Sequence, residues 1–322
     1  MTPLNRKLYR DLWRLRGQVL AIALVIASGI AVLAMSLTSM EALTETAIAY
    51  YERYRFGDVF ASVERAPEYL ADRVRKLPGV QAVDTRVVRS AVLDMEGFEE
   101  PVIGHLVSVP ERRPPDLNQL ALRSGRVPRL GYPDEAVLSE PFAEAHGLTL
   151  GGTFWAVLNG NWRQLTVVGI ALSPEFVYTI GPGALMPDDK RFGIVWLGQE
   201  AMQAAFDLDG AFNTISLTLL RGVEPDLVIE RLDDMLGRYG GIGAYARKDQ
   251  MSNWFLMNEI RQLESLAAIL PTVFLAVAAF LTNMVLARLI QMERSEIGLL
   301  KAFGYRDRDI AWHYVKFVVC VA

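Results

Sequence analysis

The stretch that decides the fold reads Arg288-Leu-Ile-Gln-Met-Glu293-Arg294-Ser-Glu296-Ile297-Gly298-Leu-Leu-Lys301-Ala302-Phe303-Gly304-Tyr305. The run before it, Ser265 to Ala287, contains no charged residue in 23 positions. As a helix with a rise of about 1.5 Å per residue, that run is about 35 Å long, enough to cross a hydrocarbon core of about 30 Å. The sequence therefore predicts a membrane span followed by a short charged helix that ends at a glycine.

A second charge-free run, Gly17 to Met40, covers 24 positions near the N-terminus. The 322 residues are 52% hydrophobic with a mean hydropathy of +0.21, which a large soluble core could also give. Two buried core helices are therefore the alternative, but such helices rarely run this far without a charge. The first run is too long for a typical secretory signal, and no clear cleavage site follows it. We predict an uncleaved first span at 17–40 and a second span at 266–287.

The distribution of charge predicts the orientation. Residues 1–16 contain five basic residues and one acidic residue, and residues 288–316 contain six basic and four acidic. Residues 41–265 carry 22 basic and 32 acidic residues, which also argues against nucleic-acid binding. Because short basic flanks stay in the cytoplasm, we expect a multi-pass membrane protein. Its N-terminus and the segment 288–311 are expected to be cytoplasmic, and residues 41–265 extracytoplasmic.

The N-terminal segment 1–16 is predicted to be an amphipathic helix on the inner leaflet. Its leucines fall on one face, and two aromatic residues are expected to anchor it at the interface. These residues are Leu8, Leu12 and Leu15 for the face, with Tyr9 and Trp13 as anchors.

Four residues of the spans are predicted to pack against another helix. Ala23, Ala27 and Ala31 recur at every fourth position of the first span, as in helices that approach closely, although ordinary apolar filler is the alternative. Asn283 lies within the second span, where a polar side chain usually faces a neighbouring helix; a substrate path is the alternative.

The segment between the spans predicts a mixed α+β domain. Its flanks, 54–109 and 211–247, are interpreted as β-α-β-β and β-α-β, a ferredoxin-like split subdomain around a β-rich insertion at 110–210. Stalk helices at 41–53 and 250–264 are expected to continue the two spans outward. Residues 312–322 turn apolar again and are predicted to start a third transmembrane helix.

The sequence lacks common motifs of nucleotide-binding and catalytic sites. There is no phosphate-binding loop and no G-x-S-x-G motif. The three histidines are scattered, and the single cysteine is Cys320. We therefore predict no catalytic, cofactor or metal site.

The motif Glu293-Arg294-x-Glu296-Ile297-Gly298-x-x-Lys301-Ala302-x-Gly304 resembles the E-R-x-E-I-G-x-x-[RK]-A-x-G block of the FtsX-like permeases of ABC transporters, which include MacB and the lipoprotein-releasing permeases. The layout is similar, since one span, a large outer domain and a second span precede the motif. The outer domain resembles the MacB periplasmic core. The first residues, from Arg6 to Gln18, resemble the start of members with two permease repeats.

This resemblance implies a non-catalytic permease of the bacterial inner membrane that acts with a cytoplasmic ABC ATPase of the MacB/LolD type, which would bind the ATP. The coupling residues would be Glu293, Arg294, Glu296, Ile297, Gly298, Lys301, Ala302 and Gly304. The permease would work as a dimer or as a two-repeat protein, and ATPase closure would move the outer domain. Because family members continue through a third and a fourth span, the resemblance also implies that this chain is a truncated product or a fragment.

Two other function classes remain open. One is a two-span sensor with an external ligand-binding domain, although a sensor would show a heptad linker after its second span. The other is a non-transporting FtsX-like regulator of a cell-wall hydrolase, whose outer domain would normally be smaller.

Overall fold

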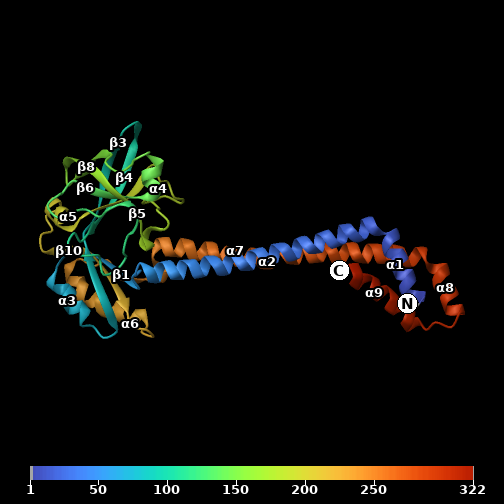
Figure 1. Ribbon diagram of the computed structural model, residues 1–322. Helices are drawn as coiled ribbons and strands as arrows, with labels where there is room; N and C mark the ends of the chain where they lie inside the picture. The colour runs from blue at the N-terminus through green and yellow to red at the C-terminus, as the bar shows by residue number, and fades with distance from the viewer. Residues whose placement is uncertain (1–2, 322) are drawn as a thin grey trace. The chain divides into compact units, whose positions relative to one another are not determined.

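The computed structural model describes residues 3–321, which divide into two units (Figure 1). A helical unit comprises the described residues up to Glu45 and those from Glu259 onward, and an α+β unit comprises Thr46–Asn258. The predicted fold class is confirmed, with two candidate membrane helices, a mixed α+β domain and a further helix at the C-terminal end of the described chain.

Five helices supply the helical unit: α1 (Pro3–Arg14), α2 (Arg16–Arg53), α7 (Met251–Met292), α8 (Arg294–Ala302) and α9 (Asp307–Val321). Helices α2 and α7 are long enough to run through the unit boundary. Their charge-free runs are rich in Ala and Leu, which are good helix formers, and α7 stays helical through Pro271. Each predicted stalk is thus the continuation of a span within one helix.

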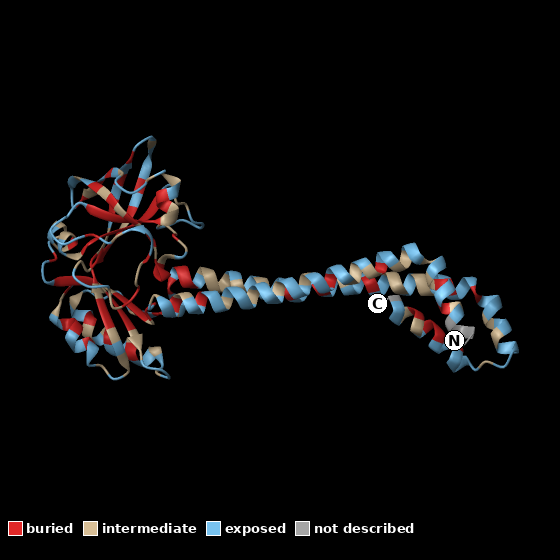
Figure 2. Cartoon of the chain, viewed as in Figure 1, coloured by how far each residue is buried: buried red, intermediate tan, exposed pale blue. Residues whose placement is uncertain are grey.

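Within the described residues, two helices are long and apolar enough to cross a membrane, α2 and α7. Only 11% of the apolar window of α2 and 17% of that of α7 is buried. Figure 2 shows the two helices mostly exposed or half-buried, whereas buried residues gather in the sheets. A core helix of a soluble domain would bury most of this surface, so the burial pattern favours membrane spans over core helices.

Helices α2 and α7 contact each other through a narrow seam. Buried and half-buried residues recur at every third or fourth position of α7: Ile260, Leu263, Ala267, Pro271, Phe274, Ala278, Leu281 and Val285. This spacing is that of a coiled-coil seam. The two backbones approach at Gly29, where an added Cβ would lie 2.9 Å from the Cβ of Phe274.

The smaller sheet of the α+β unit has four antiparallel strands in the order β11-β1-β10-β2. Its elements are β1 (Val59–Pro67), α3 (Tyr69–Arg75), β2 (Val80–Arg86), β10 (Ala211–Leu219), α6 (Pro225–Leu236), the 3-10 turn η2 (Gly237–Tyr239) and β11 (Tyr245–Ala246). A turn η3 (Arg247–Asp249) follows. Two β-α-β halves with this strand order form a ferredoxin-like sheet. Apolar residues of α3, α6 and the strands share one buried core.

The larger sheet closes into a barrel. Its order is β5-β8-β6-β9-β4-β3-β7, and β7 also pairs with β8. The strands are β3 (Val88–Met95), β4 (Phe98–Val109), β5 (Ala121–Gly125), β6 (Glu135–Ser139), β7 (Thr153–Leu158), β8 (Asn161–Leu172) and β9 (Phe192–Gly198). Short helices α4 (Glu140–Ala145) and α5 (Gln199–Ala205) and the turn η1 (Pro174–Phe176) connect them. The pairing of β7 with β8 closes six of the strands, while β5 pairs only with β8 at the edge. The barrel encloses a core of its own.

The boundary between the two subdomains differs from the predicted one. The interpretation of 54–109 as ferredoxin-like and 110–210 as the insertion is wrong, because β3 and β4 pair within the barrel. The strand-like run from Val80 to Leu93 forms two strands that separate at Val87, which is buried in the barrel core. The side chains of Asn213 and Ser108 bond the backbone there. The strand β5 was also not predicted.

Candidate coupling site

The predicted short helix is α8, and both of its ends are defined by backbone geometry. At its start, the Ile297 N–H donates to the Glu293 carbonyl at 2.9 Å, so α8 follows α7 with a break of one residue. At its end, the Gly304 N–H donates to Lys301 O and the Tyr305 N–H to Leu300 O. Gly304 has a φ of +89°, which glycine adopts without strain. These features form a Schellman motif, as the glycine predicted.

Lys7 of α1 lies at the centre of a buried ionic group at the start of α8. Its Nζ lies 2.8 Å from Glu293 Oε2, 2.7 Å from Glu296 Oε2 and 3.3 Å from Asp11 Oδ2. The Tyr314 hydroxyl of α9 donates to Glu293 Oε2 at 2.9 Å. We call Lys7, Asp11, Glu293, Glu296 and Tyr314 the Lys7 cluster. It joins α1, α8 and α9 around one glutamate, of which only 5% is exposed.

The Lys7 cluster shifts the protonation equilibria of its members. Burial works against the charge on Lys7, but hydrogen bonds to Glu293 and Glu296 outweigh it and raise the pKa of Lys7. The hydrogen bond from Lys7 lowers the pKa of Glu296. Burial, and then the charge of Glu293, raise the pKa of Asp11. The Lys7 ammonium group thus pairs with three carboxylates at a site that is largely shielded from water. Loss of Lys7 would leave buried negative charge unpaired.

An apolar cluster supports these charges. Leu8 of α1, Ile22 of α2, Leu289 of α7, and Ile310, Tyr314 and Phe317 of α9 are buried together, with Leu12, Leu15, Ile297, Leu300 and Tyr305 packed against them. The predicted leaflet face of α1 therefore packs against protein, which corrects that prediction. The predicted anchors Tyr9 and Trp13 stay exposed.

The eight predicted coupling residues divide between two faces of α8. Glu293 and Ile297 are directed into the helical unit, and Glu296 is held by Lys7 although half-exposed. Arg294, Gly298 and Ala302 are exposed, and Gly304 ends the helix. Lys301 is exposed and pairs with Asp307 at 2.6 Å. Glu293 is therefore part of the internal support, and the structure does not leave it free for an external partner.

Two apolar residues lie on the exposed face of α8. Leu299 is 57% exposed and Phe303 76% exposed, while Leu300 packs inward. They lie one turn apart, next to Gly298 and Ala302, and an added Cβ at Gly298 would meet nothing within 4 Å. We call Gly298, Leu299, Ala302 and Phe303 the outer face of α8. Its residues are apolar or small, and such a face is suited to docking against another protein.

The residues predicted for packing between the spans lie elsewhere. Ala23 is half-buried, and Ala27, Ala31 and Asn283 are exposed. The tight contact between α2 and α7 at Gly29 involves none of these four residues. The alanine repeat suggested the packing stripe, but Ala27 and Ala31 lie on an exposed face of α2.

The α+β unit holds a second buried ionic group, which the sequence did not reveal. Arg86 of β2 donates to both oxygens of Glu175 at 2.7 and 3.1 Å and to Ser216 Oγ at 2.9 Å. The Gln250 amide, just before α7, donates to the Glu175 carbonyl at 2.8 Å. Since Arg86 and Ser216 belong to the ferredoxin-like sheet and Glu175 to the insertion, this group connects both subdomains to the start of α7.

Residues 268–322 match the family model described as FtsX-like permease C-terminal. The C-terminal segment is thus similar to that of FtsX-like permeases. This match covers the end of α7, α8 and α9, and it confirms the resemblance that the E-R-x-E-I-G motif predicted. The family is that of ABC permease subunits, which are generally not catalytic. No curated protein sequence matches the chain.

Three solved structures show partial similarity to this chain. The periplasmic region of MacB from Actinobacillus actinomycetemcomitans is 12% identical with a TM-score of 0.39, covering 67% of this chain and 98% of that one. The extracellular domain of the ABC-type transporter YknZ from Gram-positive bacteria is 14% identical with a TM-score of 0.37, covering 59% and 98%. A domain of a putative permease protein from Porphyromonas gingivalis is 15% identical with a TM-score of 0.36, covering 63% and 97%.

Proposed function

We propose that this chain is the permease subunit of an ABC transporter of the FtsX/MacB type. A separate cytoplasmic ATPase of the MacB/LolD type binds α8, and ATP hydrolysis by that partner moves the extracytoplasmic domain to export or extract a substrate. The complex contains two permease units, as a dimer or as a two-repeat protein. The observation that supports this proposal is the outer face of α8, with Leu299 and Phe303 exposed on a helix fixed from behind by Lys7.

The Lys7 cluster gives the proposed docking helix the rigidity that force transmission requires. A helix of nine residues is marginal in isolation. Here Glu293 and Glu296 bind α1, the Schellman end packs Tyr305 near Leu300, and Lys301 bonds Asp307 at the start of α9. A push on α8 is then transferred to α7, which continues as one helix to Met251. In this proposal α2 and α7 relay the motion outward.

The proposed topology follows the charge distribution. The N-terminus, with the basic α1, and the segment 288–311 lie in the cytoplasm, and the α+β unit lies outside the membrane. Lys7 of α1 and Glu293 and Glu296 at α8 are then all on the cytoplasmic side, where the proposed ATPase partner acts.

The test is capture of the partner by the full chain in detergent. A MacB/LolD-type ATPase from the same genome, purified separately, should bind the immobilised wild-type permease. Leu299→Asp with Phe303→Asp should abolish capture, because two exposed apolar contacts become charged. Leu227→Asp, a matched change at an exposed leucine of α6, should leave capture unchanged. Equal capture by the Leu299→Asp/Phe303→Asp variant and by wild type would exclude the outer face of α8 as the docking surface.

A further inference from the structure

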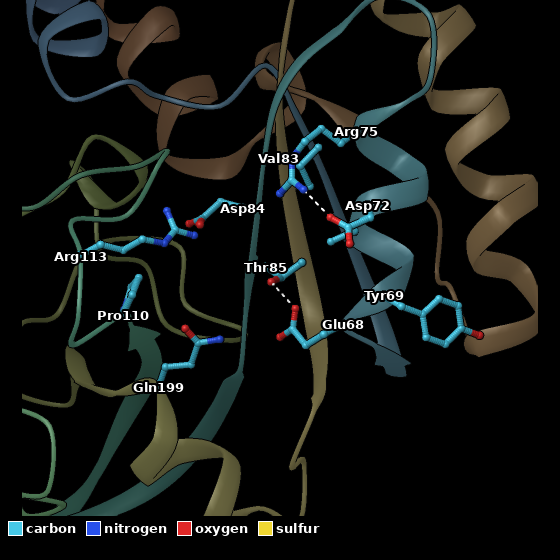
Figure 3. A pocket seen from close by; sticks show the side chains of 11 residues that line it. Glu68, Tyr69, Asp72, Arg75, Val83, Asp84, Thr85, Pro110, Arg113 and Gln199 are labelled. Carbon is cyan, nitrogen blue, oxygen red and sulfur yellow. Dashed lines mark hydrogen bonds and ion pairs between the residues drawn. The ribbon is translucent and has the colours of Figure 1, made fainter.

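A pocket of ≈ 320 Å³ lies at the free edge of strand β2 within the α+β unit (Figure 3). Glu68, which directly precedes α3, forms one side together with residues of α3 and β2, among them Asp72 and Asp84. Pro110, Arg113 and Gln199 of the insertion form the other side. The pocket therefore opens between the ferredoxin-like subdomain and the barrel, and most of its lining groups are polar.

Two carboxylates of this pocket have oxygen atoms without a partner. Asp84 is only 4% exposed, and its Oδ2 is buried with no hydrogen bond to any residue among those described. Glu68 accepts a hydrogen bond from the Thr85 hydroxyl at 2.9 Å through Oε2, but its Oε1 is likewise buried and unpartnered within 3–321. A buried carboxylate oxygen that has lost water and gained no donor is costly, so each atom points to a missing donor.

The cations near the pocket are already engaged by other acids. Arg75 lies 2.5 Å from Asp72, and Arg113 lies 2.7 Å from Asp116. Arg86, which shares a face of β2 with Asp84, holds Glu175 through both carboxylate oxygens. With these pairs formed, Asp84 Oδ2 and Glu68 Oε1 still have no hydrogen-bond donor among the described residues, while the charges of Arg86 and Arg113 act on Asp84 from nearby.

We propose that this pocket binds a small organic cation whose ammonium groups donate to Asp84 Oδ2 and Glu68 Oε1. An ammonium group carries the donors that both oxygens lack, together with a positive charge that attracts carboxylates. The cavity is also far larger than a single ion requires. Residues 3–321 contain no group of three or more His, Cys, Asp or Glu side chains that could hold a metal. Calcium requires six to eight oxygen ligands, so two carboxylates favour an amine over a metal.

The first experiment measures binding of 1,4-diaminobutane to the full chain in detergent by calorimetry and by thermal unfolding. Wild type should bind the diamine and unfold at a higher temperature in its presence. Asp84→Asn should weaken binding at least about tenfold, since the amide removes the charge at the buried oxygen. Glu68→Gln should weaken it less, because it keeps the acceptor for Thr85. Glu230→Gln, at an exposed acid of α6, is the matched control and should bind as wild type does.

Two further measurements separate a ligand site from a structural role. Without diamine, Asp84→Asn should unfold at a temperature no lower than wild type, because it removes a buried unpaired carboxylate. Burial raises the pKa of Asp84 to about 6, and the charge of Arg86 limits the rise. Since the carboxylate form binds the cation, affinity should be about tenfold weaker at pH 5 than at pH 8.

Three outcomes would overturn the proposal. They are the absence of diamine binding by wild type, equal binding by Asp84→Asn, and stabilisation by Ca²⁺ or Mg²⁺ without any by the diamine. No ATPase takes part in these measurements, so the result does not depend on the permease proposal.

Discussion

Lys7 and Glu293 form an ion pair of 2.8 Å that joins the first helix of the described chain to the junction of α7 and α8. Neither residue is exposed to any great extent, with 12% of the Lys7 side chain and 6% of the Glu293 side chain accessible. The pair thus fixes the start of the proposed docking helix from inside. Glu293 was predicted to contact a partner, but its side chain binds Lys7 of α1 and Tyr314 of α9.

Replacing Lys7 with Gln should destabilise the helical unit, because Asp11 and Glu293 would remain buried without a cation. Breaking a buried ion pair by removing one partner costs about 3–5 kcal/mol. Thermal unfolding of the full chain in detergent measures the effect, and Lys248→Gln at an exposed position is the control. Adding Glu293→Gln to Lys7→Gln should restore part of the loss, as expected for coupled residues. A purely additive double variant would mean that the pair does not form.

Glu135 should make the α+β unit sensitive to acid. Hydrogen bonds from Arg126 and Arg129 lower the pKa of Glu135 to about 2. The folded state therefore favours the carboxylate more than the unfolded state does, and the stabilisation is present above about pH 4.5 and is lost as the pH falls toward 2. Glu135→Gln should lower stability at pH 7, and its difference from wild type should shrink below pH 4.5. A difference that is constant across this range would contradict the assignment.

The parts of the fold that depend on local sequence could be predicted, and those that depend on distant contacts could not. The helices α2 and α7 follow from runs of more than twenty residues without a charge, a local signal that no distant contact can reverse. The break between β2 and β3 could not be predicted, because Val83, Val87, Val88 and Val92 continue a strand-like pattern across it. What divides the two strands is bonding to Asn213 and Ser108, which are remote in sequence.

The site shows the same distinction. Gly304 predicted the end of α8 from its own backbone preference. The choice between Leu299 and Leu300 as the inward residue was not predictable from local spacing, since both are apolar and adjacent. Which leucine faces inward depends on the positions of α1 and α9, against which Leu300 packs. The ion pair of Lys7 with Glu296 holds α1 beside α8. The lone acid Asp11 in a basic segment was the one local sign that α1 had an internal partner.

Gly29→Leu should loosen the contact between α2 and α7. Even a Cβ at this position would lie 2.9 Å from the Cβ of Phe274, which is the rigid base of its side chain. Overpacking of this kind costs about 1–3 kcal/mol. Ala27→Leu adds comparable bulk two residues away at an exposed position and should have little effect. Thermal unfolding of both variants in detergent decides the point, and a larger loss for Ala27→Leu would restore the alanine stripe as the packing face.

Gly298→Leu should separate folding from partner binding. An added side chain at Gly298 meets nothing within 4 Å, and glycine is about 1 kcal/mol less favourable than alanine inside a helix. The isolated permease should therefore be as stable as wild type or slightly more stable. If the ATPase docks on the outer face of α8, the new side chain lies at the contact and binding should weaken at least about tenfold, with Gly298→Ala in between. Ala311→Leu on α9 is the control for added bulk. Unchanged ATPase affinity in a folded Gly298→Leu variant would mean that the partner does not approach α8 on this face.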